Sequence, residues 1–137
     1  MLDRAVRALA RRDLSAESLR AKLARAGVSE EAQNDALETL ERAGYVDDAR
    51  FARARAEQLV TRGYGDDWIR ADLDAQGVGV EVAADAIAGL EPEAERAPGE
   101  WAKLRGGLAA ARTMARRGFA EETLEALLAQ HPSTGVG

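Results

Sequence analysis

The chain has 137 residues, with 19 basic and 24 acidic side chains, no cysteine and one histidine. These numbers exclude disulfides and thiolate metal sites, argue against histidine-based catalysis, and allow one domain or two very small ones. The net charge of −5 excludes a uniformly cationic DNA-binding surface, and no apolar run is long enough for a signal peptide or a membrane span, so we expect a cytoplasmic protein.

Alanine, arginine, glutamate and leucine dominate the chain, and only 4% of the residues are aromatic, so the composition predicts an all-α protein. Capping residues before apolar stripes, and glycines after them, set the expected helix boundaries. The expected caps are Ser15, Ser29, Asp47 and Asp66. Up to Leu90 we expect helices over about residues 3–12, 15–27, 29–44, 47–63, 66–77 and 80–90.

The last third of the chain begins with residues 92–100, which are rich in proline, glycine and glutamate and predict a break. An apolar stripe from Trp101 to Met114 then predicts a helix that stops at Gly118, and the pair Gly106-Gly107 is expected to kink or divide it. A final helix is expected over about residues 121–130, and residues 132–137 are expected to form a disordered tail.

Three helix corners repeat along the chain, with Leu14, Tyr64 and Phe119 in equivalent places. An apolar residue follows each of them after five positions and again after nine; these are Leu19, Ile69 and Leu124, then Leu23, Leu73 and Leu128. The pattern predicts tandem three-helix repeats over residues 1–44, 45–91 and 92–131, each too small to bury its apolar face alone. We expect the third repeat to be truncated, because only a polar tail follows its second predicted helix.

No catalytic arrangement is visible in the sequence, and no glycine-rich stretch is followed by Lys-Ser or Lys-Thr. The pairs Asp47-Asp48 and Asp66-Asp67 allow a Mg²⁺ site, but each pair precedes a predicted helix, which favours helix capping. Tyr64 and Phe119 could stack on nucleobases, but their place at helix corners favours the core. We therefore predict no catalytic residue, no metal site and no cofactor.

Exposed arginines and one tryptophan are the better candidates for contact with a partner. Arg50 and Arg53 share a helical face, and Arg105, Arg112 and Arg116 have the spacing of a second one. Trp68 follows an inward position by about 100° around its helix, so we expect it at the rim, beside Arg70.

The motifs resemble those of the RecX family of regulatory proteins. Residues 44–53, Gly-Tyr-Val-Asp-Asp-Ala-Arg-Phe-Ala-Arg, resemble the central signature of that family, and residues 62–65, Arg-Gly-Tyr-Gly, resemble its continuation. Residues 8–12 with Ser15 and Leu19 resemble the opening repeat, and residues 116–119 resemble the closing one. The resemblance covers about residues 4–130.

This resemblance implies an elongated, curved array of three-helix repeats that binds the RecA recombinase filament on single-stranded DNA. It implies suppression of strand exchange and of the coupled ATP hydrolysis, without enzymatic activity. We expect a monomer with weak or indirect contact to single-stranded DNA. The candidate contact residues are Arg50, Arg53, Arg62, Trp68, Arg70, Arg112 and Arg116.

Two other functions remain open at this point. The first is a helical module that binds DNA directly through Arg50, Arg53, Arg112 and Arg116, with strong salt dependence. Residues 63–100 argue against tight DNA binding, because they carry two basic and ten acidic side chains. The second is an unrelated helical scaffold, which would bind neither DNA nor the recombinase.

Overall fold

The computed structural model describes Val6 and residues 14–132, and all regular structure in these residues is helical. The predicted helix over residues 3–12 lies outside this part except for Val6, which is helical and buried. None of the helices described combines the length and the apolar character needed to cross a bilayer. The helices are α2 (Ala16–Arg25), α3 (Glu30–Arg42), α4 (Asp48–Thr61), α5 (Asp66–Ala75), α6 (Val80–Ala88), α7 (Glu93–Lys103), α8 (Gly107–Arg116) and α9 (Glu121–Gln130).

Three of the four predicted caps are confirmed by hydrogen bonds. The side chains of Ser15, Ser29 and Asp47 accept bonds of 3.0–3.2 Å from the backbone N–H three residues later. The prediction for Asp66 was wrong, because Gly65 occupies the N-cap of α5 and Asp66 is already its first helical residue. The carboxylate of Asp66 instead pairs with Arg96, at 2.8 Å.

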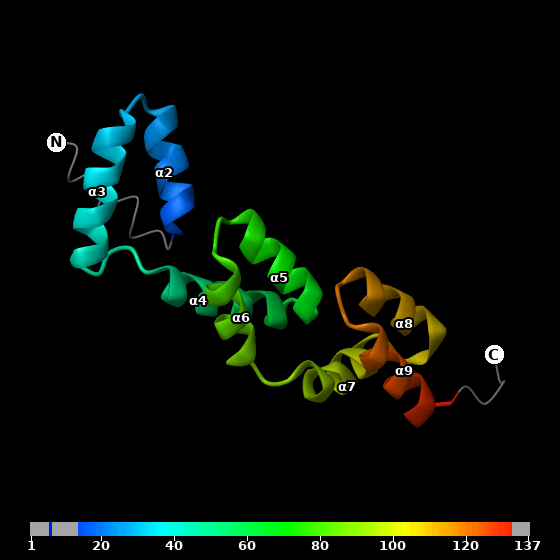
Figure 1. Cartoon of the computed structure of the whole chain (residues 1–137). Helices are drawn as coiled ribbons and strands as arrows, with labels where there is room; N and C mark the ends of the chain where they lie inside the picture. Colours follow the sequence, from blue (N-terminus) through cyan, green and yellow to red (C-terminus); the bar gives the residue numbers. More distant parts are fainter. Residues whose placement is uncertain (1–5, 7–13, 133–137) are drawn as a thin grey trace.

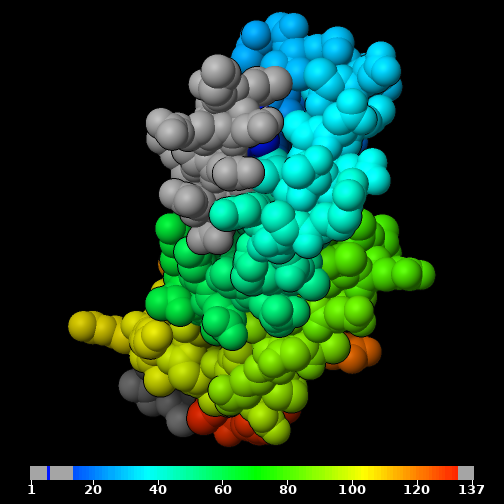
Figure 2. All heavy atoms as spheres, turned by 90° about the vertical axis from the view of Figure 1, so that its left-hand side faces the viewer, coloured from blue at the N-terminus to red at the C-terminus, as the bar shows by residue number. Residues whose placement is uncertain are grey.

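The buried apolar side chains form three separate clusters, which define three units of the array (Figure 1). Unit 1 contains α2 and α3, unit 2 contains α4, α5 and α6, and unit 3 contains α7, α8 and α9. The units follow one another in a bent, elongated array, with each core shared mainly by neighbouring helices. The space-filling view shows the same order, from blue at one end to red at the other (Figure 2).

The repeated corner residues pack as the sequence predicts. Phe119 is buried in the core of unit 3, while Leu14 and Tyr64 are half-buried against the cores of units 1 and 2. Five residues after each corner, an apolar side chain is buried in the respective core; these are Leu19, Ile69 and Leu124. The three corners therefore play equivalent parts in three equivalent cores.

Unit 3 corrects one expectation. Residues 93–103 form α7 rather than a break, although Pro98 lies inside the helix and cannot donate a backbone hydrogen bond. Burial of Ala97 and Trp101 against the core compensates for that loss, because both side chains face α8 and α9. The third repeat therefore has three helices, but α7 and α8 both precede its corner, and no helix follows α9 among the described residues, as predicted.

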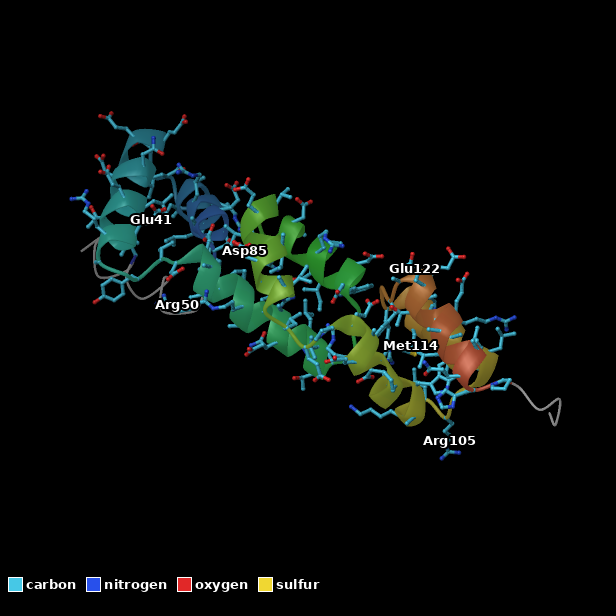
Figure 3. All side chains as sticks on the ribbon, turned by 60° about the horizontal axis from the view of Figure 1, so that its bottom comes forward. Glu41, Arg50, Asp85, Arg105, Met114 and Glu122 are labelled. Carbon is cyan, nitrogen blue, oxygen red and sulfur yellow. The ribbon has the colours of Figure 1, made fainter. Side chains whose placement is uncertain are left out.

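The predicted division at the glycine pair is confirmed. Arg105, Gly106 and Gly107 all have positive φ, between 63° and 78°; the first two lie between α7 and α8, and Gly107 is the first residue of α8. Arg105 consequently lies outside both helices. The spacing predicted that it shares a helical face with Arg112 and Arg116, and that prediction was wrong. Figure 3 shows Arg105 pointing away from unit 3, whereas Met114 lies among its helices.

Candidate partner-binding surface

The joint between units 2 and 3 brings two equivalent corners into direct contact. The backbone N–H of Gly65 donates to the carbonyl of Arg117 at 2.8 Å, and that of Asp67 donates to the carbonyl of Gly118 at 3.1 Å. A Cβ atom on Gly65 would lie 2.6 Å from the carbonyl carbon of Gly118, and one on Gly118 would overlap Trp68. Bare glycines are therefore required on both sides of this joint.

A buried carboxylate reinforces the same joint. Glu93, the first residue of α7, is only 9% exposed. It accepts hydrogen bonds from the N–H of Asp66 at 2.9 Å, the N–H of Ala120 at 3.2 Å and the hydroxyl of Thr123 at 2.7 Å. The N-termini of α5, α7 and α9 thus converge on one negative charge, which their dipoles stabilise. Units 2 and 3 therefore present their surfaces in a fixed relation to each other.

Trp68 is exposed at this joint, as the sequence predicts. The residue is 42% exposed. Its ring stacks on that of Tyr64, with ring centroids 4.5 Å apart and ring planes at 13° to each other. The backbone of Trp68 also lies against Gly118. Gly118 thus restricts the backbone of this residue and Tyr64 its ring, and an exposed tryptophan held in this way is typical of an interface anchor. Arg70 is exposed nearby on α5 and pairs with Asp67 at 3.0 Å.

Arg62 and Arg116 also lie near the joint. Arg62 is three residues before Gly65, and Arg116 is two residues before Gly118. Arg62 is exposed at the end of α4, beside Gly63, which lies close to the side chains of Glu100 and Arg117. Arg116 ends α8 and donates to the hydroxyl of Thr113 at 3.2 Å. Arg62, Trp68 and Arg116 therefore each lie within three residues of a joint glycine along the chain.

Arg50 and Arg53 lie at the other end of α4. Twelve residues separate Arg50 from Arg62, which corresponds to about 18 Å along a helix. The guanidinium of Arg50 donates to the carbonyls of Gly44 and Tyr45 at 3.3 and 3.4 Å, so it braces the α3–α4 connection (Figure 3). Arg53 is exposed, and its side chain has no partner in the described part of the chain.

Arg112 is exposed on α8, one turn before Arg116 and opposite the buried stripe of Ala110, Ala111 and Met114. The seven candidates therefore spread over α4, α5 and α8 instead of lining one pocket. Such a distribution suits contact with an extended partner surface, which is the usual mode of binding for repeat proteins.

Sequence reasoning missed three polar contacts that shape this surface. Arg55 and Asp72 form a two-pronged ion pair between α4 and α5, with both N–O distances at 2.8 Å. The hydrogen bond to Asp72 raises the pKa of Arg55 above its ordinary value. Asp48 accepts from the N–H of Ala16 at 2.8 Å, and Glu93 bridges units 2 and 3 as described above. No local sequence signal marks any of these, because each partner lies far along the chain.

The acidic pairs serve the scaffold. Asp47 caps α4, Asp48 bonds to the start of α2, Asp66 pairs with Arg96 and Asp67 pairs with Arg70. Across Val6 and residues 14–132, no three acidic or histidine side chains are grouped so that they could hold a metal ion.

Comparison with known proteins identifies the relatives of the chain. Residues 47–87, which span nearly all of unit 2, match the family described as "RecX, second three-helix domain". The chain is 40% identical over 94 residues to the regulatory protein RecX of Chromohalobacter salexigens, covering 69% of this chain and 62% of that protein. It is 33% identical over 131 residues to the regulatory protein RecX of Xanthomonas campestris pv. campestris, covering 86% of this chain and 79% of that protein.

The fold has the same relatives. The crystal structure of RecX from Lactobacillus salivarius superposes with a TM-score of 0.75 at 14% identity, covering 85% of this chain and 84% of that one. This agreement shows a shared fold, and the sequence matches show common ancestry. The chain therefore belongs to the RecX family of regulatory proteins.

Proposed function

We propose that the chain regulates the RecA recombinase by binding its filament on single-stranded DNA, thereby suppressing ATP hydrolysis and strand exchange. It catalyses no reaction itself. The observation that carries this proposal is the rigid, elongated surface on which Trp68 and the exposed arginines lie on successive units. A filament repeats one subunit surface along its length, so an elongated array fits it better than a single pocket would.

The direct test is an ATPase assay with RecA on single-stranded DNA. We expect the purified chain to lower the rate of ATP hydrolysis and to sediment with the filament. An unchanged rate together with no co-sedimentation would refute the proposal. We also propose that the chain acts in the cytoplasm as a monomer, which analytical ultracentrifugation can check for its oligomeric state.

Trp68→Ala is the sharpest variant for this test. Removing a fixed, exposed indole is expected to weaken filament binding about tenfold or more, as for other interface tryptophans. Leu108→Ala is the matched control, because Leu108 is another large apolar residue, 57% exposed, on α8. Equal losses for the two variants would show that Trp68 is not a specific contact.

Two double variants test the arginines, and each of them removes two positive charges from the chain. Arg53→Ala with Arg112→Ala removes two exposed guanidinium groups that have no side-chain partner among the described residues. Arg25→Ala with Arg42→Ala removes two exposed charges from unit 1. We expect only the first pair to reduce filament affinity, with both double variants retaining wild-type helicity.

Direct DNA binding is the second candidate function, and the exposed guanidinium groups of Arg53, Arg62 and Arg112 favour it. It predicts binding to single-stranded DNA without RecA. The logarithm of the binding constant should then fall with the logarithm of salt concentration by roughly one unit per phosphate neutralised. Absence of binding at low salt would remove this candidate and leave the recombinase proposal intact.

A further inference from the structure

A groove separates the second half of α4 from α7, and none of the seven candidate contact residues lines it. The groove has a volume of about 630 Å³ and is bounded by α4, the α6–α7 connection and α7. The apolar side chains of Val60 and Leu90 line it and are half-buried. A half-buried apolar surface inside a groove of this size can receive an apolar side chain from a partner.

The groove has an acidic rim. Glu57, Glu91 and Glu95 are exposed, and none of their carboxylates has a partner in the described part of the chain. Each of the two basic side chains of the groove already has an acidic partner within the chain. Arg96 has a side chain only 7% exposed and pairs with Asp66 at 2.8 Å, and Lys103 pairs with Glu100 at 3.3 Å. Three negative charges therefore remain available to a partner.

Gly99 gives the groove part of its width. This glycine lies in the interior of α7, where glycine destabilises a helix relative to alanine. Its φ is in the ordinary helical range, and a Cβ atom built there would meet nothing within 4 Å. Neither backbone conformation nor packing within the chain requires glycine at this position. A side chain there would project into the groove, so the absence of one keeps the groove open.

We infer that this groove docks a basic segment of a partner protein, in which lysine or arginine side chains flank an apolar one. The apolar side chain lies on Val60 and Leu90, and the cations reach the carboxylates of Glu57, Glu91 and Glu95. The same rim repels phosphate groups, so the occupant is a protein and not DNA. The inference rests on the proposed function in one respect, because it takes the partner to be a subunit of the RecA filament.

The charge of the rim is tested with the full chain and the RecA filament on single-stranded DNA. The triple variant Glu57→Gln, Glu91→Gln, Glu95→Gln should lower filament affinity about tenfold and weaken its salt dependence, because three charge pairs are lost. The matched control is Asp74→Asn, Glu81→Gln, Asp85→Asn, which removes the same charge from exposed positions of unit 2 outside the groove. We expect the control to bind within about twofold of wild type.

The shape of the groove is tested separately. Gly99→Leu should reduce filament binding without lowering helicity, since the new side chain fills the groove, while Gly99→Ala should have a small effect. Wild-type affinity in both the triple variant and Gly99→Leu would overturn the inference and leave the proposed function standing.

A peptide probe tests the chemistry without the filament. A synthetic peptide of alternating lysine and leucine is titrated into the ¹⁵N-labelled chain, and the amide signals of Gly89 and Gly99 are followed by NMR. We expect saturable shifts at both glycines, abolished in the triple glutamine variant. Saturable shifts together with no filament binding would refute the proposed function and support the groove as a site for a basic segment. No shift at either glycine would overturn the inference.

Discussion

The two joints of the array are built differently. Between units 1 and 2, the described hydrogen bonds are the hydroxyl of Ser15 donating to the carbonyl of Gln76 and the N–H of Ala16 donating to Asp48. Between units 2 and 3, two backbone–backbone bonds, the bond from the N–H of Asp66 to Glu93 and the Arg96–Asp66 ion pair cross the joint. Glu93 also accepts two bonds from α9 within unit 3, from the N–H of Ala120 and the hydroxyl of Thr123.

The difference shows how a repeat array can be stiff at one joint and less constrained at another. Backbone–backbone bonds demand that two chains approach closely, which Gly65 and Gly118 permit. The joint between units 1 and 2 also includes a close approach, because a Cβ atom on Gly77 would overlap Glu17, but no backbone–backbone bond crosses it among the described residues. Its two hydrogen bonds, from Ser15 and to Asp48, therefore leave fewer groups to break. We therefore expect units 2 and 3 to move as one body, and Trp68 to keep its position within it.

The largest expected effect is that of Glu93→Ala. The variant leaves the N–H groups of Asp66 and Ala120 and the hydroxyl of Thr123 without their acceptor, so we expect the free energy of unfolding to fall by about 3 kcal/mol. Urea denaturation measures this loss. Glu121→Ala is the control, because Glu121 is also the first residue of a helix but is exposed. A loss no larger than that of the control would show that Glu93 does not hold the joint.

The next effect is that of Gly65→Ala. The new Cβ atom would lie 2.6 Å from the backbone of Gly118, so the two corners must separate, at a cost of about 2 kcal/mol. Hydrogen exchange of the Gly65 and Asp67 amides should accelerate, because both donate across the joint.

Gly79→Ala is the matched control for this variant. Gly79 is likewise an N-cap glycine with ordinary φ, and a Cβ atom there would meet nothing within 4 Å. Any change of capping preference is common to both variants. Similar destabilisation by the two substitutions would mean that the close approach of the corners contributes nothing.

Local signals in the sequence were enough to predict the units but not the joints. Ser15, Ser29 and Asp47 cap the helices that follow them, and Leu19, Ile69 and Leu124 are buried at equivalent positions. These features depend on residues within one or two helical turns, which a pattern can reveal. The repeat spacing then predicts equivalent corners, and the packing of Tyr64 and Phe119 confirms it.

Contacts between distant segments explain the failures. Residues 93–103 form a helix in spite of Pro98 because Glu93 and Trp101 anchor it to other helices. The exposure of Trp68 followed from its helical angle, whereas its stacking on Tyr64 and its contact with Gly118 depend on the joint. The sequence did not predict the acidic rim of the groove either, because Glu57 and Glu95 lie on different helices that only the fold brings together.

Ser15→Ala tests the looser joint, with an intermediate effect. Ser15 is fully buried, caps α2 and bonds to the carbonyl of Gln76 in unit 2, so we expect a loss of about 1.5 kcal/mol. Ser29→Ala removes an equivalent cap that is exposed and makes no bond to another unit, with an expected loss of about 1 kcal/mol. The difference between the two, measured by thermal denaturation, reports the contribution of the bond across the joint. A difference as large as the loss in Glu93→Ala would make the two joints equally strong.

Asp48→Asn has the smallest expected effect and separates charge from hydrogen bonding at the looser joint. Asparagine keeps an oxygen that can accept from the N–H of Ala16, but it removes the negative charge at the N-termini of α2 and α4. The expected loss is about 0.5 kcal/mol, the size of a helix-dipole interaction at a partly exposed site. Asp48→Ala removes the acceptor as well and should cost about 1 kcal/mol. If Asp48→Asn costs as much as Asp48→Ala, the charge and not the bond holds unit 1 to unit 2, and this joint should then weaken with added salt while the Gly65–Gly118 joint does not.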